Sequence, residues 1–340
     1  MRSPLSFDPI LTRALAGEAP TRDECRYLLG LDEHSGEARM LMAVADHVTR
    51  SRFDNDAVLF GQVGFETSPC SGECDFCTFS RTLGSVPHER LSVDDVVARA
   101  RAFTATGDVF ALFLMTMHVW DFDAFAEAAR AVREAIPAHT RLVANVGDFG
   151  LERAKKLRDL GVSGVYHVLR LREGADTRLE PATRLRSIDA AREVGLDFYY
   201  CLEPVGPEHT PEEMVEQLFV GVERGSFQHA AMRRVRLPGS RLAAHGQITN
   251  LRLAQVTAVV ALATLRTRET TNIAVHEPNL LGLTAGANAI YAETGANPRD
   301  ARNDTSSARG LDVAAARRML HEAGFTRLRR GDGTHVALTG

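Results

Sequence analysis

The chain has 340 residues, of which 44% are hydrophobic and 25% charged, and its formal net charge is −4 at pH 7. No apolar run approaches the roughly 18 residues that a membrane span needs, so this globular composition excludes a membrane role. The sequence has no basic excess or basic stripe, which argues against nucleic acid as a partner. The first 20 residues lack the apolar core and cleavage site of a signal peptide. We therefore expect a cytoplasmic protein without disulfides.

Along the chain, residues 7–50 are predicted to be helical, with Thr21 as a helix cap. From residue 58 onward, short apolar runs alternate with amphipathic stretches, the pattern of repeated βα units. The predicted strands are 58–66, 109–116, 141–146, 164–170, 197–203, 229–235, 271–276 and 287–292. The predicted helices between them include 121–136, 183–195, 210–225 and 251–266.

Eight βα units indicate an α/β fold of the closed (β/α)8, or TIM-type, barrel class, with its chemistry at the carboxyl ends of the strands. An open doubly wound sheet is the alternative, because the strand pattern does not show closure. We expect a single domain, 1–340. Its parts are a helical amino-terminal extension (1–55), the barrel (56–295) and a carboxyl-terminal extension (296–340) with a helix over 311–325.

Three of the five cysteines, Cys70, Cys74 and Cys77, fall within eight residues, in the loop after the first predicted strand. Three thiolates from one loop can hold three irons of a 4Fe–4S cube and leave the fourth iron without a protein ligand. A structural zinc site is the alternative, but such sites close with four ligands, and no second cysteine pair is present. The spacing therefore favours an iron–sulfur cluster with an open position.

The motif C-x3-C-x-aromatic-C, with Phe76 in the aromatic slot, resembles the radical S-adenosylmethionine (SAM) superfamily. The resemblance implies a 4Fe–4S cluster and SAM as cofactors. In that superfamily, SAM is cleaved to a 5′-deoxyadenosyl radical that abstracts hydrogen from a substrate. It also implies an electron donor of the flavodoxin or ferredoxin type.

Within the superfamily, residues 55–325 resemble the biotin-synthase-like group, which includes biotin synthase and a hydrogenase maturase. The stretch "TRLRSIDAAREVGLDF" is similar to the helix whose arginine binds the SAM carboxylate, which places Arg184 in that role; a bidentate contact to a carboxylate suits a guanidinium. A solvated helix charge is the alternative for Arg184. The other SAM contacts that the resemblance implies are Phe76, Thr116, Arg170, Glu173 and Val205, with Pro204 and Gly206 beside Val205.

Polar side chains gather at the predicted strand ends, which indicates a small polar substrate. These residues are His118, Asn145, His167, Glu203, His229, His276 and Glu277. Glu203 and Glu277, paired with His209 and His276, are candidates for proton transfer or substrate anchoring; solvated glutamates beside loop-stiffening prolines are the alternative. A second metal held by His118, His229 and His276 is an alternative role for these histidines.

The remaining cysteines bear on the reaction class. Biotin synthase draws sulfur from an auxiliary cluster held by further barrel cysteines, but here only Cys201 remains in the barrel, while Cys25 lies outside it. We therefore expect hydrogen abstraction followed by rearrangement, elimination or carbon–carbon bond chemistry. The alternatives are a sulfur-inserting enzyme working with a partner, and a non-catalytic iron–sulfur scaffold.

Overall fold

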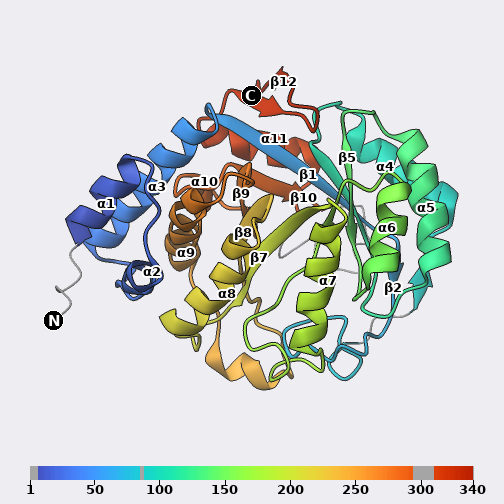
Figure 1. The fold of residues 1–340 in the computed structure, drawn as a ribbon, viewed down its shortest axis with the longest axis horizontal. Coiled ribbons are helices and arrows are strands. Elements are labelled where there is room, and N and C mark those ends of the chain that lie inside the picture. Colours follow the sequence, from blue (N-terminus) through green and yellow to red (C-terminus); the bar gives the residue numbers. More distant parts are fainter. Residues whose placement is uncertain (1–6, 85–87, 294–309, 340) are drawn as a thin grey trace.

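The computed structural model describes residues 7–84, 88–293 and 310–339 (Figure 1). Eight parallel strands pair in the order β1, β4, β5, β6, β7, β8, β9, β10, and β10 pairs with β1. Their bounds are β1 Asp56–Gly64, β4 Ala111–Met115, β5 Arg141–Asn145, β6 Gly164–Tyr166, β7 Asp197–Val205, β8 Gln228–Arg233, β9 Asn272–His276 and β10 Ala289–Ala292. Because β10 returns to β1, the predicted closed barrel is confirmed and the open sheet is excluded.

Helices surround the barrel, and each returns the chain to the next parallel strand (Figure 1). Their bounds are α4 Val93–Thr104, α5 Phe122–Ala135, α6 Leu151–Asp159, α7 Pro181–Glu193, α8 Pro211–Glu223, α9 Asn250–Ala263 and α10 Leu280–Leu283. Short elements lie in the loops: β2 Glu66–Thr67, β3 Glu89–Arg90, η1 Arg241–His245 and η2 Thr264–Arg266. None of the helices in the described ranges has the length and apolar character of a membrane span.

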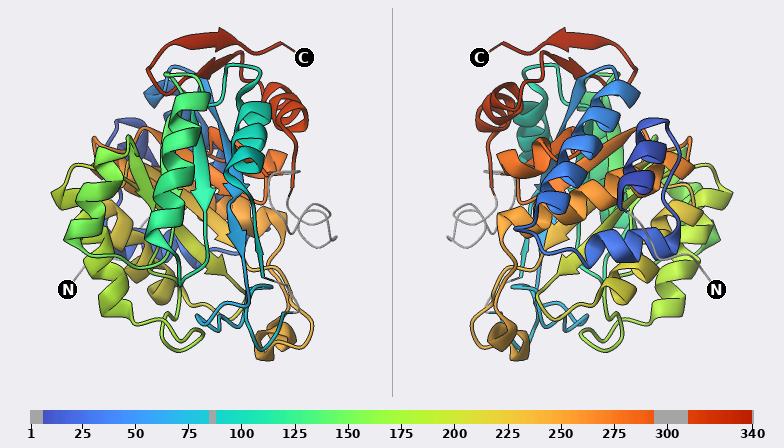
Figure 2. Two further views of the ribbon diagram at one scale, coloured as in Figure 1. Left: turned by 90° about the vertical axis from the view of Figure 1, so that its right-hand side faces the viewer. Right: turned by 90° about the vertical axis from the view of Figure 1, so that its left-hand side faces the viewer.

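Three amino-terminal helices, α1 (Phe7–Leu15), α2 (Arg22–Leu29) and α3 (Gly36–Arg52), pack on the outside of the barrel, where α3 contacts α9 and α2 contacts α8 (Figure 2). Thr21 caps α2 as predicted, because its hydroxyl accepts from the backbone of Glu24 while the Glu24 carboxylate accepts from the backbone of Thr21. This reciprocal capping satisfies two backbone donors that the helix start leaves free.

Aromatic side chains fill the interior of the barrel. Phe113 packs edge-on against Tyr199 and Tyr291, with ring centroids 5.3 and 5.2 Å apart, and Phe60 lies 5.6 Å from Phe113. Edge-to-face pairs at these distances stabilise a core beyond the area that they bury. The interior is therefore a packed floor, and open space is left toward the carboxyl ends of the strands.

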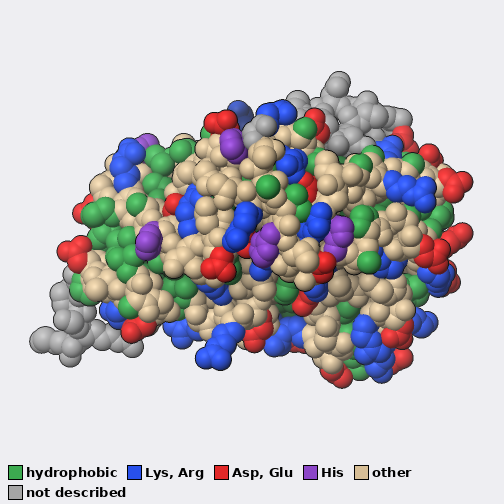
Figure 3. Space-filling view, turned by 90° about the horizontal axis from the view of Figure 1, so that it is seen from above, with side chains coloured by type: hydrophobic (Ala, Val, Ile, Leu, Met, Phe, Trp, Pro, Cys, Tyr) green, Lys and Arg blue, Asp and Glu red, His purple; other side chains and the backbone are tan. Residues whose placement is uncertain are grey.

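The carboxyl-terminal segment closes the opposite end. Helix α11 (Val313–Glu322) matches the predicted helix, and it is followed by a hairpin of β11 (Arg327–Arg329) and β12 (His335–Ala337), which the sequence did not predict. Strand β11 pairs in parallel with the start of β1, at the end of the barrel opposite the cysteine loop (Figure 1). The expected boundary at 295/296 lies outside the described residues. Seen from above, this face carries interspersed acidic and basic side chains (Figure 3).

Candidate functional site

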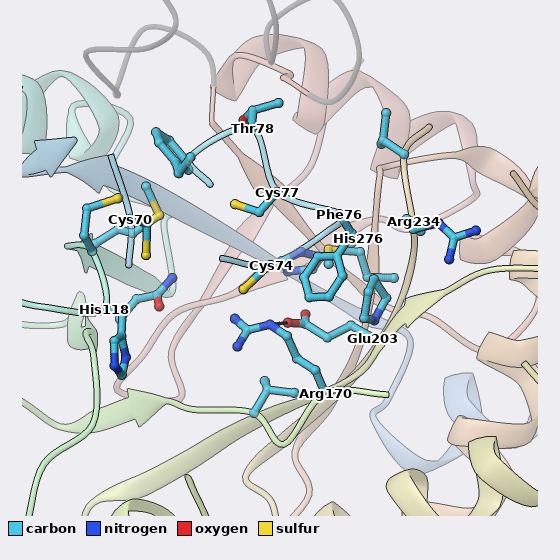
Figure 4. Close-up of a pocket in the computed structure, with 18 of the residues that line it drawn as sticks. Cys70, Cys74, Phe76, Cys77, Thr78, His118, Arg170, Glu203, Arg234 and His276 are labelled. Carbon is cyan, nitrogen blue, oxygen red and sulfur yellow. Dashed lines mark ion pairs between the residues drawn. The ribbon is translucent and has the colours of Figure 1, made fainter. Parts of the chain in front are cut away.

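A cavity of about 510 Å³ opens at the carboxyl ends of the strands. The cysteine loop forms one wall, and residues at or just beyond the carboxyl ends of β4, β5, β6, β7, β8, β9 and β10 form the others. Figure 4 shows the three cysteines around one open space, with Arg170 and Glu203 across from them. Of the predicted site residues, those that line the cavity are Cys70, Cys74, Phe76, Cys77, Thr116, His118, Asn145, Arg170, Arg184, Glu203, Pro204 and His276.

The cysteine loop is held at its base by backbone hydrogen bonds. The Cys70 N–H donates to the Phe79 carbonyl at 2.7 Å, and the Arg81 N–H donates to the Cys70 carbonyl at 3.2 Å. Inside the loop, the buried Glu73 carboxylate accepts from Thr82 at 2.6 Å and from Arg81 at 2.9 Å. These contacts fix the loop that presents the thiols while leaving the thiols themselves on the cavity wall.

The three thiols are placed where they could hold an iron–sulfur cluster. Thiolates are soft ligands suited to iron–sulfur clusters. Cys70, Cys74 and Cys77 all line the same cavity, as ligands of one cube of four irons must. Burial raises the pKa of the Cys74 thiol to about 12, and the charge of Arg170 opposes that rise.

Across the cavity, Glu203 at the end of β7 is held by two donors. The Tyr166 hydroxyl donates to its Oε2 at 2.6 Å, and Arg170 Nε lies 3.1 Å from its Oε1. Burial works against the charge of Arg170, but Glu203 and Glu173 raise its pKa above the usual arginine value. Burial also raises the pKa of Tyr166 well above its usual value. Glu203 therefore has a fixed orientation in a buried, charged pair.

His276 ends β9 and lies between two aromatic rings. Its ring is stacked on Tyr166 at 6.1 Å between centroids and meets Tyr291 edge-on at 4.1 Å. Both tyrosines belong to the packed floor of the barrel, so His276 marks the boundary between that floor and the cavity.

The loops after β5 and β6 meet the start of α7 at Asp148. Arg184 Nη1 donates to its Oδ1 at 2.8 Å, His167 Nε2 lies 2.9 Å from the same oxygen, and His118 Nδ1 lies 3.8 Å from Oδ2. Burial opposes ionisation of Asp148, but the hydrogen bond from His167 and the charge of Arg184 hold its pKa below its usual value. Three basic side chains thus share one carboxylate.

His229 does not lie in the cavity, so its predicted place at the barrel mouth is wrong. It is completely buried between β8 and α8, with Nδ1 3.1 Å from the Ala230 carbonyl and Nε2 3.2 Å from the Leu218 carbonyl. Burial lowers its pKa to about 4. The predicted histidine trio for a second metal, with His118 and His276, is therefore not assembled.

Four other predicted residues lie behind the cavity wall. Glu277, at φ 62°, forms an ion pair with Arg233. His209 Nδ1 accepts from the Gly206 N–H at 2.9 Å. The predicted pairing of His209 with Glu203 is therefore wrong. Val205 is buried, and Glu173 accepts from the Arg170 N–H at 3.0 Å and from Thr177 at 2.8 Å. None of the four is among the residues that line the cavity.

Sequence reasoning missed Tyr166, Asp148 and Arg234. Arg234 lines the cavity and forms a buried ion pair with Glu208. Each follows or ends a strand: Tyr166 ends β6, Asp148 lies three residues beyond β5, and Arg234 directly follows β8. That position at the carboxyl end of a barrel strand is the signal that could have found them.

Gly147 lets two of the cavity loops meet. A Cβ on Gly147 would lie 1.7 Å from the His118 carbonyl oxygen, a separation that backbone atoms cannot adopt. We expect Gly147→Ala to displace the His118 segment and to lower the free energy of unfolding by about 1–3 kcal/mol, the usual cost of overpacking. Urea unfolding measures this loss. Gly150→Ala is the matched control, since its Cβ meets nothing within 4 Å; equal stability of the two variants would contradict the packing argument.

No protein-family model matches the chain, and no curated protein matches it. Solved structures do match. Methylornithine synthase (PylB) is 17% identical, with a TM-score of 0.79 over 95% of this chain and 98% of that one. HydG, a maturase of the [FeFe]-hydrogenase, is 15% identical, with a TM-score of 0.75 over 95% and 76%.

HydG from Carboxydothermus hydrogenoformans is 17% identical, with a TM-score of 0.72 over 94% of this chain and 78% of that one. The chain has the fold of methylornithine synthase and of the hydrogenase maturase HydG. The resemblance to the biotin-synthase-like group, drawn from the cysteine motif and the surrounding segments, is therefore confirmed at the level of the fold. At these identities the likeness concerns the barrel, and the chemistry has to be argued from the side chains.

Proposed function

We propose that this chain is a radical SAM enzyme that acts on a small polar substrate. The observation that carries the proposal is that Cys70, Cys74, Cys77 and Arg184 line one cavity at the carboxyl end of a complete barrel. The cysteines would hold a 4Fe–4S cluster, and Arg184 would bind the carboxylate of SAM. When bound, the cluster and SAM supply a 5′-deoxyadenosyl radical that abstracts hydrogen from the substrate.

The chain's own residues would orient the reactants and exclude water. Phe76 on the cysteine loop and Thr116 directly after β4 line the cavity, where they would contact SAM. Arg170, which is predicted to contact SAM, forms an ion pair with Glu203 across from the cysteines. Glu203 would face the substrate, and the aromatic floor closes the barrel beneath the pair. A dry, enclosed site of this kind protects a reactive intermediate from side reactions.

The cysteines of the barrel bear on which reaction would follow hydrogen abstraction. PylB is named as a synthase and HydG as a maturase, so the two neighbours differ in what they make. Cys201 is completely buried in the barrel, next to Tyr166 and Glu203, and burial raises the pKa of its thiol well above the usual value. One buried thiol supports hydrogen abstraction followed by rearrangement, elimination or carbon–carbon bond chemistry over sulfur insertion.

The test is SAM cleavage by the anaerobically reconstituted protein. With dithionite as reductant, we expect 5′-deoxyadenosine and methionine to form in equal amounts, measured by chromatography and mass spectrometry. A flavodoxin or ferredoxin is the proposed physiological donor and should replace dithionite. A protein that holds a cluster but neither binds nor cleaves SAM would be a scaffold, and the proposal would then be wrong.

A further inference from the structure

Asp148 joins the elements that surround one corner of the cavity. It lies between β5 and α6, and its carboxylate meets Arg184 from α7, His167 after β6 and His118 after β4. The His167 side chain is fully buried, and burial lowers its pKa to about 3, so the neutral ring donates from Nε2 to Asp148. Asp148 thus accepts hydrogen bonds from Arg184 and His167, which come from two separate elements, while His118 lies 3.8 Å away on a third.

The contacts of Arg184 fix the direction of its guanidinium. Nε donates to the Val168 carbonyl at 3.3 Å and lies 3.8 Å from the Glu173 carboxylate, while Nη1 donates to Asp148 at 2.8 Å. Among the described residues, none accepts a hydrogen bond from Nη2, and Arg184 lines the cavity. Two of its three nitrogens are therefore held by the protein, and the third is left for a ligand.

We propose that Asp148 is a positioning residue that orients Arg184 so that its Nη2 can bind the carboxylate of SAM. The inference rests on the proposed function, since it names SAM as the anion. An arginine side chain has several rotatable bonds, and a buried carboxylate on one face of the guanidinium removes most of that freedom before the ligand arrives. The same carboxylate balances a buried positive charge that would otherwise be costly.

The experiment compares two ligands on the reconstituted holoenzyme. SAM carries the carboxylate, whereas 5′-methylthioadenosine has the nucleoside and sulfur but lacks the amino acid portion. We expect Asp148→Ala to weaken SAM binding by about tenfold or more, as for loss of a hydrogen bond to a charged group, and to change 5′-methylthioadenosine binding by less than about twofold. Calorimetry gives both dissociation constants.

Asp148→Asn is the conservative variant, because its amide oxygen can still accept from Arg184 and His167. We expect it to restore SAM binding to within about threefold of wild type. Asp108→Ala is the matched control: Asp108 is also buried and paired with an arginine, Arg317, but it precedes β4 at the other end of the barrel. This control should lose stability and keep SAM affinity.

The outcomes separate the two proposals. Equal weakening of SAM and 5′-methylthioadenosine by Asp148→Ala would show a merely structural role and overturn the inference, as would unchanged SAM binding. Failure of the wild-type holoenzyme to bind SAM would overturn the proposed function, and the inference with it. Selective loss of SAM binding, rescued by asparagine, is the result that supports the positioning role.

Discussion

Replacing any one of Cys70, Cys74 or Cys77 by alanine is expected to abolish the cluster and with it SAM cleavage. Wild-type protein should contain about four irons per chain, and each variant should contain less than about one. SAM cleavage should fall by about 100-fold or more, because removing a single ligand of three leaves the cube without a stable protein frame. Iron analysis, absorbance near 400 nm and 5′-deoxyadenosine formation measure the three quantities.

Two buried cysteines serve as matched controls. Cys25 lies in α2, outside the barrel, and Cys201 lies on β7 inside it; both side chains are fully buried. Cys25→Ala and Cys201→Ala should keep the iron content and the basal SAM cleavage of wild type. Iron loss in Cys201→Ala, or cluster retention in a loop variant, would show that the ligand set is misassigned and would reopen the sulfur-inserting alternative.

The barrel was predictable from the sequence because each strand is a short apolar run followed by an amphipathic helix. Every one of the eight predicted ranges overlaps a barrel strand in the structure, from β1 to β10. The hairpin of β11 and β12 was not predictable in this way. Its strands have three residues each, which is too short for an alternating pattern to show, and β11 pairs with the start of β1.

The site was harder to predict because alternation along a strand decides which side chains enter a barrel. On β8, Gln228 bonds to Tyr291 in the interior and Met232 lines the cavity, so His229 on the alternate face points to α8. The sequence places a polar residue near a strand end but does not say which face it occupies. The cysteines and Arg184 could be predicted without knowing which face of a strand they occupy, because sequence motifs identified them.

A second class of contact depends on tertiary structure entirely. Asp148, Arg184 and His167 are brought together from segments up to 36 residues apart. Likewise Tyr166 meets Glu203 across 37 residues, because β6 and β7 are neighbours in the barrel. Asp148, His167 and Tyr166 carry no sequence motif, and they form a site only because neighbouring strands of the barrel bring them together.

Glu203→Gln is expected to lower product formation by about 100-fold or more while SAM binding changes by less than about threefold. The carboxylate is buried, with its two oxygens fixed by Tyr166 and Arg170 on the wall opposite the cysteines. Glutamine keeps the shape and one acceptor but removes the charge, so a substrate that needs this carboxylate would lose its anchor or its proton acceptor. Candidate deuterated metabolites, screened for transfer of deuterium into 5′-deoxyadenosine, identify the substrate for the assay.

Two further variants test whether product formation depends on the charge of Glu203 or on the packing around it. Tyr166→Phe removes the hydrogen bond to Glu203 and keeps the pair with Arg170, so product formation should fall by a smaller factor, about tenfold. Glu24→Gln is the matched control, since Glu24 is a buried glutamate paired with Arg13 far from the cavity, in α2. It should leave turnover unchanged. If Glu203→Gln kept wild-type turnover with the identified substrate, Glu203 would be a structural partner of Arg170 alone, and the search for the substrate-binding carboxylate would move to Glu293, which also lines the cavity.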